Sequence, residues 1–485
     1  METHTAANDE MPMSTTCRGP VSWLGVAALA LVLLAGAPAA RANGRFPAAQ
    51  YVIVGPGAAS DTIALRATYG VLLSRDAGRT FRWLCEESIG YAGEYDPTLA
   101  MTADGALHVG IPDGLAQSRD ACTFTLNPTL GTFLAADTST DPAGERIVGA
   151  DGNGGARNHL FFSDDRGRTF RRSASFLEPG WFQTVDVAPS DPRIVYATYQ
   201  ADATARPEFR LYRTTDDGAT LPLVRTDFMG GRDAFLSGVD PTNPDRIWLR
   251  SNLVTLAGTM LLRSDDAGRT LRLMHTTMFR AAGFALSDDG QRVWFGGPDD
   301  GLLYSDNRGE SFRQVSDVMV SCLRYHAGAL YICADDRLDG FTLARWRDGA
   351  PAMEPLIRVR DVLGAMDCPA GTAAHDVCAA RWPAQRAMFI YPERDAGTDA
   401  RVDAQRDVAS TMDAGLTDGG AAMDGQPADE QPRPGGGCRC RAGFVRGTDA
   451  PFAIVAVACA VVVSASRRRR RRSVTPRATR RLSAR

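Results

Sequence analysis

The chain has 485 residues, of which 44% are hydrophobic, 23% charged and 8% aromatic, and this composition excludes wholesale disorder. The formal net charge of -3 hides a division, because residues 467–485 carry ten arginines and no acid. The rest of the chain is correspondingly acidic, which argues against nucleic-acid binding by its folded part.

Residues 1–42 have the pattern of a secretory signal peptide. An apolar run occupies residues 21–36, with Arg18 before it and the small-residue sequence Ala40-Arg41-Ala42 after it. A run this short that ends in small residues is typical of a signal cleaved after Ala42, rather than of a retained membrane anchor. The sequence therefore predicts that the protein is exported.

The body of the chain, residues 43–394, repeats one octapeptide. Serine or threonine comes first, aspartate third, glycine fifth, a hydroxyl residue seventh and an aromatic residue or leucine eighth. The copies recur every 41 to 51 residues and begin at Ser74, Ser118, Ser163, Thr214, Ser264 and Ser305. The copy at Ser118 has lost one residue and its glycine, and a worn seventh copy centres on Asp348 and Gly349.

Each position of the octapeptide has a physical reason. The aspartate accepts backbone N–H groups in a tight turn, the glycine two residues later adopts a positive φ without steric strain, and the closing aromatic side chain is buried. Each copy therefore predicts a hairpin turn. The residues that we assign to these structural turns are Ser74, Asp76, Gly78, Phe81, Ser118, Asp120, Phe124, Ser163, Asp165, Gly167, Phe170, Asp216, Gly218, Ser264, Asp266, Gly268, Ser305, Asn307, Gly309 and Phe312.

Short apolar segments flank the turns. Residues 70–73 and 260–262 directly precede a copy, and residues 193–197 and 246–249 lie one strand earlier, with proline and glycine turn signals between them. Four short strands in each unit are typical of a β-propeller blade. The sequence predicts an all-β propeller of seven blades, with six as the alternative. Helices are expected only in the N-terminal signal and in a C-terminal transmembrane segment.

The octapeptide resembles the Asp-box, or BNR repeat, S-x-D-x-G-x-[ST]-[FW]. Its setting is similar to the propellers of sortilin-type receptors, xyloglucan-cleaving glycosidases, the photosystem II assembly factor family and sialidases. The resemblance implies that the turns are structural and lie near blade edges, away from a central channel where ligands bind. Because these relatives include receptors, assembly factors and hydrolases, the fold alone does not assign an activity.

Residues 395–437 consist mainly of Asp, Ala, Gly, Thr and Pro, and such a segment cannot bury enough apolar surface to fold. We interpret it as a disordered acidic linker. Beyond it, the apolar residues 451–466 are followed directly by Arg467 to Arg472. Because basic residues stay on the cytoplasmic side, this order predicts a transmembrane span whose preceding body is exported.

Cys438 and Cys440 stand just before the span. The order of cysteine motif, short span and arginine cluster within residues 438–472 resembles the MYXO-CTERM sorting signal of myxobacterial surface proteins. That resemblance implies that a sorting protease processes the signal and that the cysteine region is where the protein is cut and anchored. Residues 473–485 are then a basic cytoplasmic tail, and the mature protein lies on the outer surface or is secreted.

Six cysteines remain in the exported body: Cys85, Cys122, Cys322, Cys333, Cys368 and Cys378. An even number in an oxidising compartment predicts disulfides. Closeness in sequence favours the pairs Cys322–Cys333 and Cys368–Cys378, which leaves Cys85 with Cys122. Metal binding is the weaker alternative, because no cysteine or histidine cluster has the spacing of a metal site.

No catalytic motif stands out. The aspartates lie mainly in turns, the histidines are scattered, and we expect neither a cofactor nor a metal. Trp181 follows Pro179 and Gly180 in a predicted loop and is the best single candidate for a ligand contact. The leading hypothesis is a non-enzymatic propeller that binds a glycan, peptide or protein, and the alternative is a glycoside hydrolase. A cluster of arginine, tyrosine and carboxylates at the channel mouth would favour the hydrolase.

Overall fold

The computed structural model describes residues 47–93, 95–153, 157–202, 208–254 and 258–390. The predicted signal peptide, acidic linker, sorting motif with Cys438 and Cys440, transmembrane span and basic tail lie outside these residues. Within the described ranges, no helix has the length and apolar character needed to cross a membrane.

The described residues contain seven antiparallel sheets, each made of four strands that are consecutive in sequence. The first four sheets consist of β1 (Ala49–Val54), β2 (Ile63–Ala67), β3 (Gly70–Ser74) and β4 (Arg82–Leu84); β5 (Thr98–Met101), β6 (Leu107–Ile111), β7 (Gly114–Ser118) and β8 (Thr125–Leu126); β9 (Ala135–Thr140), β10 (Ile147–Asp151), β11 (Leu160–Ser163) and β12 (Arg171–Arg172); β13 (Gly180–Val187), β14 (Val195–Ala201), β15 (Glu208–Thr214) and β16 (Leu223–Arg225). The last three consist of β17 (Phe235–Val239), β18 (Ile247–Asn252), β19 (Thr259–Ser264) and β20 (Arg272–Thr276); β21 (Gly283–Leu286), β22 (Val293–Gly297), β23 (Gly301–Ser305) and β24 (Arg313–Ser316); β25 (Cys322–His326), β26 (Ala329–Cys333), β27 (Leu343–Arg347) and β28 (Glu354–Ile357).

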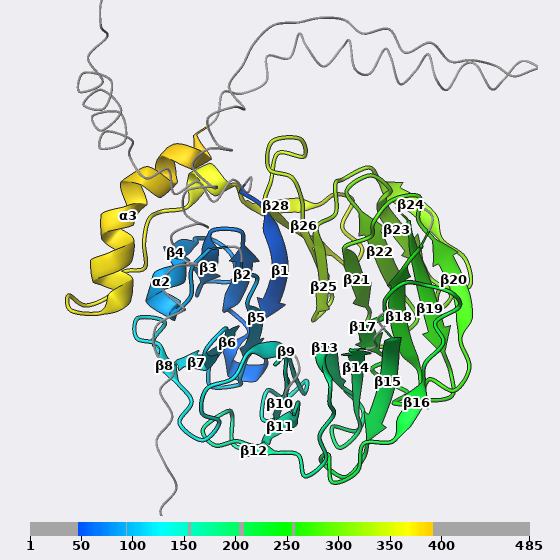
Figure 1. The fold of residues 1–485 in the computed structure, drawn as a ribbon. Helices are drawn as coiled ribbons and strands as arrows, with labels where there is room; N and C mark the ends of the chain where they lie inside the picture. The colour runs from blue at the N-terminus through cyan, green and yellow to red at the C-terminus, as the bar shows by residue number, and fades with distance from the viewer. Residues whose placement is uncertain (1–46, 94, 154–156, 203–207, 255–257, 391–485) are drawn as a thin grey trace, which may run out of the picture. The chain divides into compact units, whose positions relative to one another are not determined.

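The seven sheets are the blades of a closed ring (Figure 1). The first strand of each blade contacts the first strand of the next, from β1 through β5, β9, β13, β17 and β21 to β25, and β25 returns to contact β1. The prediction of a seven-blade propeller is therefore confirmed, and the six-blade alternative is wrong. Within the described residues every blade uses four consecutive strands, so each blade is built from one continuous stretch of chain.

Each octapeptide lies between the third and fourth strands of a blade, where the sequence predicted a hairpin turn. In the first copy, the Ser74 hydroxyl donates to the Asp76 carboxylate at 2.7 Å and accepts from the Gly78 N–H at 2.9 Å. Asp76 in turn accepts from the Thr80 N–H at 2.9 Å. Gly78 has a φ of 88°, and Ala77 before it also lies in the left-handed region at 59°. The second positive φ was not predicted, because alanine does not favour it.

The shortened copy closes its turn one residue earlier than the others. The Ala121 N–H, rather than that of a glycine, donates to the Ser118 hydroxyl at 2.9 Å, and Ala121 has a φ of 60°. The Asp120 carboxylate accepts the N–H groups of Cys122 and Thr123. The missing residue thus changes the shape of the turn without removing its hydrogen bonds.

The closing aromatic residues are less uniformly buried than the sequence predicted. Phe81 and Phe170 are buried, whereas Phe124 and Phe312 are half-buried. In the seventh blade, Asp348 and Gly349 do occupy the turn between β27 and β28. The Asp348 carboxylate there accepts hydrogen bonds from Arg292, just before β22, and from Tyr325 of β25, so that it joins blades 6 and 7.

Residues 358–389, which we call the C-terminal strap, follow the last blade and pack against the outside of the first (Figure 1). The strap contains η2 (Val359–Asp361) and α3 (Ala373–Phe389); two short helices, η1 (Gly57–Ala59) and α2 (Glu86–Ile89), lie within and after the first blade. Helices in the body were not predicted. In α3 only four of 17 residues are buried, one of these is a glutamine, and Pro383 lies inside the helix, so the sequence carries only a weak apolar stripe.

The strap extends the first blade by backbone hydrogen bonding. The Leu363 N–H donates to the Phe81 carbonyl, the Trp83 N–H to Gly364, and the Met366 N–H to the Trp83 carbonyl, all within 3.1 Å. Trp83 and Ala365 form a parallel bridge. The strap therefore covers the outer edge of β4, which would otherwise expose unpaired backbone groups.

Three disulfides form, and they involve all six cysteines of the body: Cys85–Cys378, Cys122–Cys368 and Cys322–Cys333. The predicted pair Cys322–Cys333 is confirmed, whereas the predicted pairs Cys85–Cys122 and Cys368–Cys378 are wrong. Proximity in sequence failed because the strap returns to the beginning of the body. The two long-range disulfides attach it covalently to the chain that leaves blade 1 and to the shortened turn of blade 2.

Adjacent blades pack through large side chains that lie beneath the glycine of the next octapeptide. A Cβ atom placed on Gly167 would lie 2.1 Å from the His108 ring, and one on Gly309 would lie 2.5 Å from the Trp248 ring. Both rings are buried, His108 on β6 and Trp248 on β18. His108 therefore has a packing role.

We expect His108 to make the fold sensitive to acid. Burial, reinforced by the charge of Arg119, lowers the pKa of His108 to about 4. The unfolded chain takes up this proton as the pH falls through about 6.5, but the folded chain does not. The wild type should lose about 2 to 3 kcal/mol of stability relative to His108→Leu between pH 7.5 and pH 4.5 in urea unfolding. An equal difference between the two proteins at both pH values would contradict this assignment.

Candidate functional site

The strand order gives the ring two different faces. The octapeptide turns and the turns between first and second strands lie on one side, which we call the box face. The links between second and third strands and the links between blades lie on the other, which we call the connection face. Connections such as 226–234 and 334–342 are longer than the tight turns of the box face. Binding residues concentrate on such longer connections.

Charged side chains of four blades act on one another around the axis of the ring. Tyr51 lies on β1, Asp137 on β9, Asp186 on β13 and Arg324 on β25. The pKa of Tyr51 is raised by burial, an effect that the charge of Arg324 opposes and the charges of Asp137 and Asp186 reinforce. This group contains the residue types of a hydrolase site, so the hydrogen bonds of each member decide what it can do.

The two aspartates are engaged in joining blades. One oxygen of Asp137 accepts the Val185 N–H of the next blade at 3.0 Å, and the other accepts the Thr138 N–H at 2.9 Å. The Asp186 carboxylate accepts from the Ser139 hydroxyl of the preceding blade at 2.7 Å. Ser139 itself accepts the Val187 N–H of the following blade.

Neighbouring threonines repeat this arrangement. Thr98 accepts the Thr138 N–H, and Thr184 accepts the Leu236 N–H, each from the next blade of the ring. The first strand of a blade is an edge strand, so the N–H groups along its free edge have no partner strand. Side chains of the preceding blade supply the missing acceptors, which is a structural role.

The pKa shifts at the axis argue against an activated tyrosine but not against a carboxyl group that acts as an acid. Burial raises the pKa of Asp137 to about 6, although hydrogen bonds from Val185 and Thr138 oppose the shift. Burial also raises the pKa of Asp186. A tyrosine nucleophile requires activation by a nearby base, and the raised pKa of Tyr51 is a change in the opposite direction.

The sequence predicted that Trp181 lies in a loop, and this prediction is wrong. Trp181 is the second residue of β13, pairs with Gln200 of β14 and is half-buried. A half-buried strand residue presents less of its ring to a ligand than a loop residue does. Trp181 is therefore a weaker candidate for a ligand contact than the sequence indicated.

Four large hydrophobic side chains are exposed on the three connections of blade 5, and sequence reasoning missed them. We call Met229, Val254, Met278 and Phe279 the blade-5 apolar group; their exposed fractions are 45%, 65%, 73% and 43%. They belong to the links before β17, between β18 and β19, and after β20. Hydrophobic residues in a loop follow no helical or strand periodicity. Only the presence of a large hydrophobic residue among polar loop residues could have indicated them.

Side-chain hydrogen bonds fix the connection that carries Met278 and Phe279. The Asp300 carboxylate accepts the N–H groups of both residues at 2.9 and 3.1 Å, and the Thr277 hydroxyl donates to the Phe279 carbonyl at 2.6 Å. The exposed Arg232 and Arg280 lie on the same connections. A fixed loop that presents methionine, phenylalanine and arginine has the composition of a protein interface.

Among the residues that the structure describes, no group of three or more His, Cys, Asp and Glu side chains could hold a metal ion. No protein-family description and no curated protein matches the chain. Solved structures do resemble it at low identity. Hydrazine synthase from Kuenenia stuttgartiensis is 11% identical with a TM-score of 0.46, over 64% of this chain and 99% of that one.

Two further structures are similar to this chain. The Dos1 propeller is 14% identical with a TM-score of 0.44, over 64% of this chain and 84% of its own. The GH74 enzyme from Niastella koreensis is 15% identical with a TM-score of 0.25, over 66% of this chain and 63% of its own. At these identities and scores the likenesses carry no argument about ligand or activity.

Proposed function

We propose that this protein is an exported, surface-anchored propeller that binds a protein partner without enzymatic activity. The blade-5 apolar group carries the proposal, because exposed methionine and phenylalanine side chains on a fixed loop, flanked by arginines, are typical anchors of protein interfaces. Export is supported by the signal-like N-terminus and by the pairing of all six body cysteines, since such disulfides persist in oxidising compartments.

Photo-crosslinking tests the binding surface. The full chain is expressed in its native cells with a photo-reactive amino acid in place of Met278, and in a matched protein in place of Leu223, an exposed residue of β16 outside the blade-5 apolar group. We expect a discrete crosslinked protein from position 278 that weakens at least tenfold when Phe279→Ser is added. The same products from both positions would overturn the assignment of this surface.

Glycoside hydrolysis is the second candidate, because of the raised pKa of Asp137 beside Asp186. A general acid of this kind must hold its proton near neutral pH. We expect no turnover of chromogenic glycosides by the full chain, since both oxygens of Asp137 accept backbone N–H groups. Hydrolysis that Asp137→Asn abolishes, while the variant stays folded, would establish the hydrolase instead.

The proposed anchoring has its own test. Mass spectrometry of the surface form should recover peptides up to the cysteine motif at Cys438 and Cys440 and none from the arginine-rich end. Recovery of peptides beyond Cys440 from the mature form would contradict processing at that motif. The binding surface is unaffected by this outcome.

A further inference from the structure

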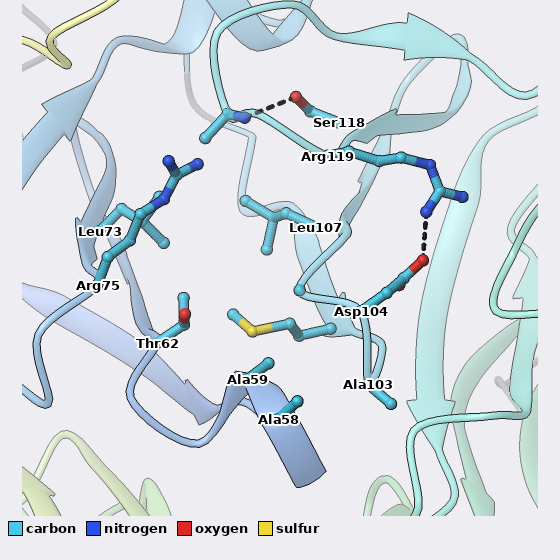
Figure 2. Close-up of a pocket in the computed structure, with 13 residues that line it drawn as sticks. Ala58, Ala59, Thr62, Leu73, Arg75, Ala103, Asp104, Leu107, Ser118 and Arg119 are labelled. Atoms are coloured by element: carbon cyan, nitrogen blue, oxygen red, sulfur yellow. Dashed lines mark hydrogen bonds and ion pairs between the residues drawn. The ribbon is translucent and has the colours of Figure 1, made fainter.

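A cavity of about 270 Å³ opens on the box face between blades 1 and 2 (Figure 2). Its apolar wall includes Leu73, Met101 and Leu107, together with Ala58 and Ala59 from the turn after β1. The guanidinium groups of Arg75 and Arg119 lie on opposite sides of it in Figure 2. The hollow thus combines an apolar interior with a cationic rim.

The cavity has a sequence origin. On β6 and β18 the second residue is large, His108 or Trp248, and it lies beneath the glycine of the next octapeptide. On β2 the equivalent residue is Ala64, and the next octapeptide is the shortened copy, in which Cys122 replaces the glycine. Between blades 1 and 2, the small side chain of Ala64 faces the shortened turn, and this combination leaves space that a large side chain fills elsewhere. The Cys122–Cys368 disulfide attaches that turn to the C-terminal strap.

The rim has an excess of positive charge. Arg75 donates to the carbonyl oxygen of Asp120, and among the described residues no carboxylate pairs with it. Asp104 pairs with Arg119 and also lies 3.5 Å from the Arg168 guanidinium, so this one carboxylate serves two arginines. The Asp120 carboxylate is occupied by Ser118, Cys122 and Thr123 of its own turn.

We propose that this cavity binds a small organic carboxylate, with its apolar body against Leu73, Met101 and Leu107 and its charge at Arg75. A guanidinium without a carboxylate partner matches a carboxylate ligand through two parallel N–H donors. A cavity of about 150 Å³ is enough for a six-carbon ring, so this larger hollow has room for a chain or ring of about six to ten carbons. The site lies on the opposite face from the blade-5 apolar group, and either proposal can fail without the other.

The test titrates hexanoate into the purified full chain, with 1-hexanol as the uncharged probe of the same length. Saturation-transfer NMR should show saturable hexanoate binding at least tenfold tighter than hexanol binding. Arg75→Gln should weaken hexanoate binding at least tenfold, and Ala58→Phe, at an exposed alanine of the wall, should abolish it. Arg79→Gln, an exposed arginine of the same turn that does not line the cavity, should leave it unchanged.

Three results would overturn the proposal. The first is the absence of saturable hexanoate binding to the wild type, and the second is equal binding by the wild type and Arg75→Gln. Hexanol binding as tight as hexanoate binding would show an apolar hollow without anion recognition, which also contradicts it. Matching thermal unfolding midpoints of Arg75→Gln, Arg79→Gln and the wild type ensure that the comparison concerns the site and not the fold.

Discussion

Removing the disulfide between Cys85 and Cys378 should lower the free energy of unfolding by about 4 kcal/mol in the chain-entropy model of crosslinking. The bond joins residues 293 positions apart, but the Cys122–Cys368 bond inside that span remains in the variant. The loop that Cys85–Cys378 alone closes in the unfolded chain therefore has about 50 residues. It also holds the C-terminal strap against blade 1, where Trp382 packs on Trp83 with ring centroids 5.8 Å apart. Guanidinium unfolding of Cys85→Ser/Cys378→Ser, followed by tryptophan fluorescence, measures the effect.

The matched control is the short disulfide of blade 7. Cys322 and Cys333 are 11 residues apart on the neighbouring strands β25 and β26, and the same model gives about 3 kcal/mol for their bond. Cys322→Ser/Cys333→Ser should therefore lose about 1 kcal/mol less stability than the Cys85 and Cys378 variant. Equal losses would mean that holding the strap against blade 1 adds no stability beyond that of a short local crosslink.

The strap also marks the limit of prediction from this sequence. The blade number could be predicted because each octapeptide forms its turn from hydrogen bonds within a few residues, such as those of Asp76 with Ser74 and Thr80. The partner of Cys85 could not, because it depends on where a segment almost 300 residues later returns. The buried residues of α3 recur at helical intervals, but they include Ala374 and Gln385 and the helix contains Pro383, so its apolar stripe is too weak to reveal its type.

The exposure of the blade-5 apolar group could not be predicted from the sequence either. Polarity patterns predict which strand residues are buried, but they do not say that Met278 and Phe279 remain exposed once the Asp300 carboxylate fixes their loop. Trp181 looked like a loop residue because Pro179 and Gly180 precede it, yet β13 begins at Gly180. Loop contacts set by distant side chains were therefore beyond what composition and periodicity could supply.

Gly309→Ala should destabilise the protein by about 3 kcal/mol, whereas Gly349→Ala should cost only about 1 kcal/mol. The two glycines are matched in backbone conformation, with φ angles of 77° and 76°, so alanine meets the same backbone strain at both. Their surroundings differ. A Cβ on Gly309 would lie 2.5 Å from the Trp248 ring, while a Cβ on Gly349 would have no atom within 4 Å.

The difference between the two variants isolates the packing of one blade against the next. Trp248 is fully buried and cannot move without disturbing the core between blades 5 and 6, which includes Val293 and Phe295. Trp248→Phe should therefore destabilise the Gly309→Ala protein less than it destabilises the wild type, a coupling that urea unfolding of the four proteins measures. Additive effects of the two substitutions, or equal losses at Gly309 and Gly349, would mean that the side chains around Gly309 rearrange to accommodate the added methyl group. The octapeptide glycine would then be required only for its turn and not for the contact between blades.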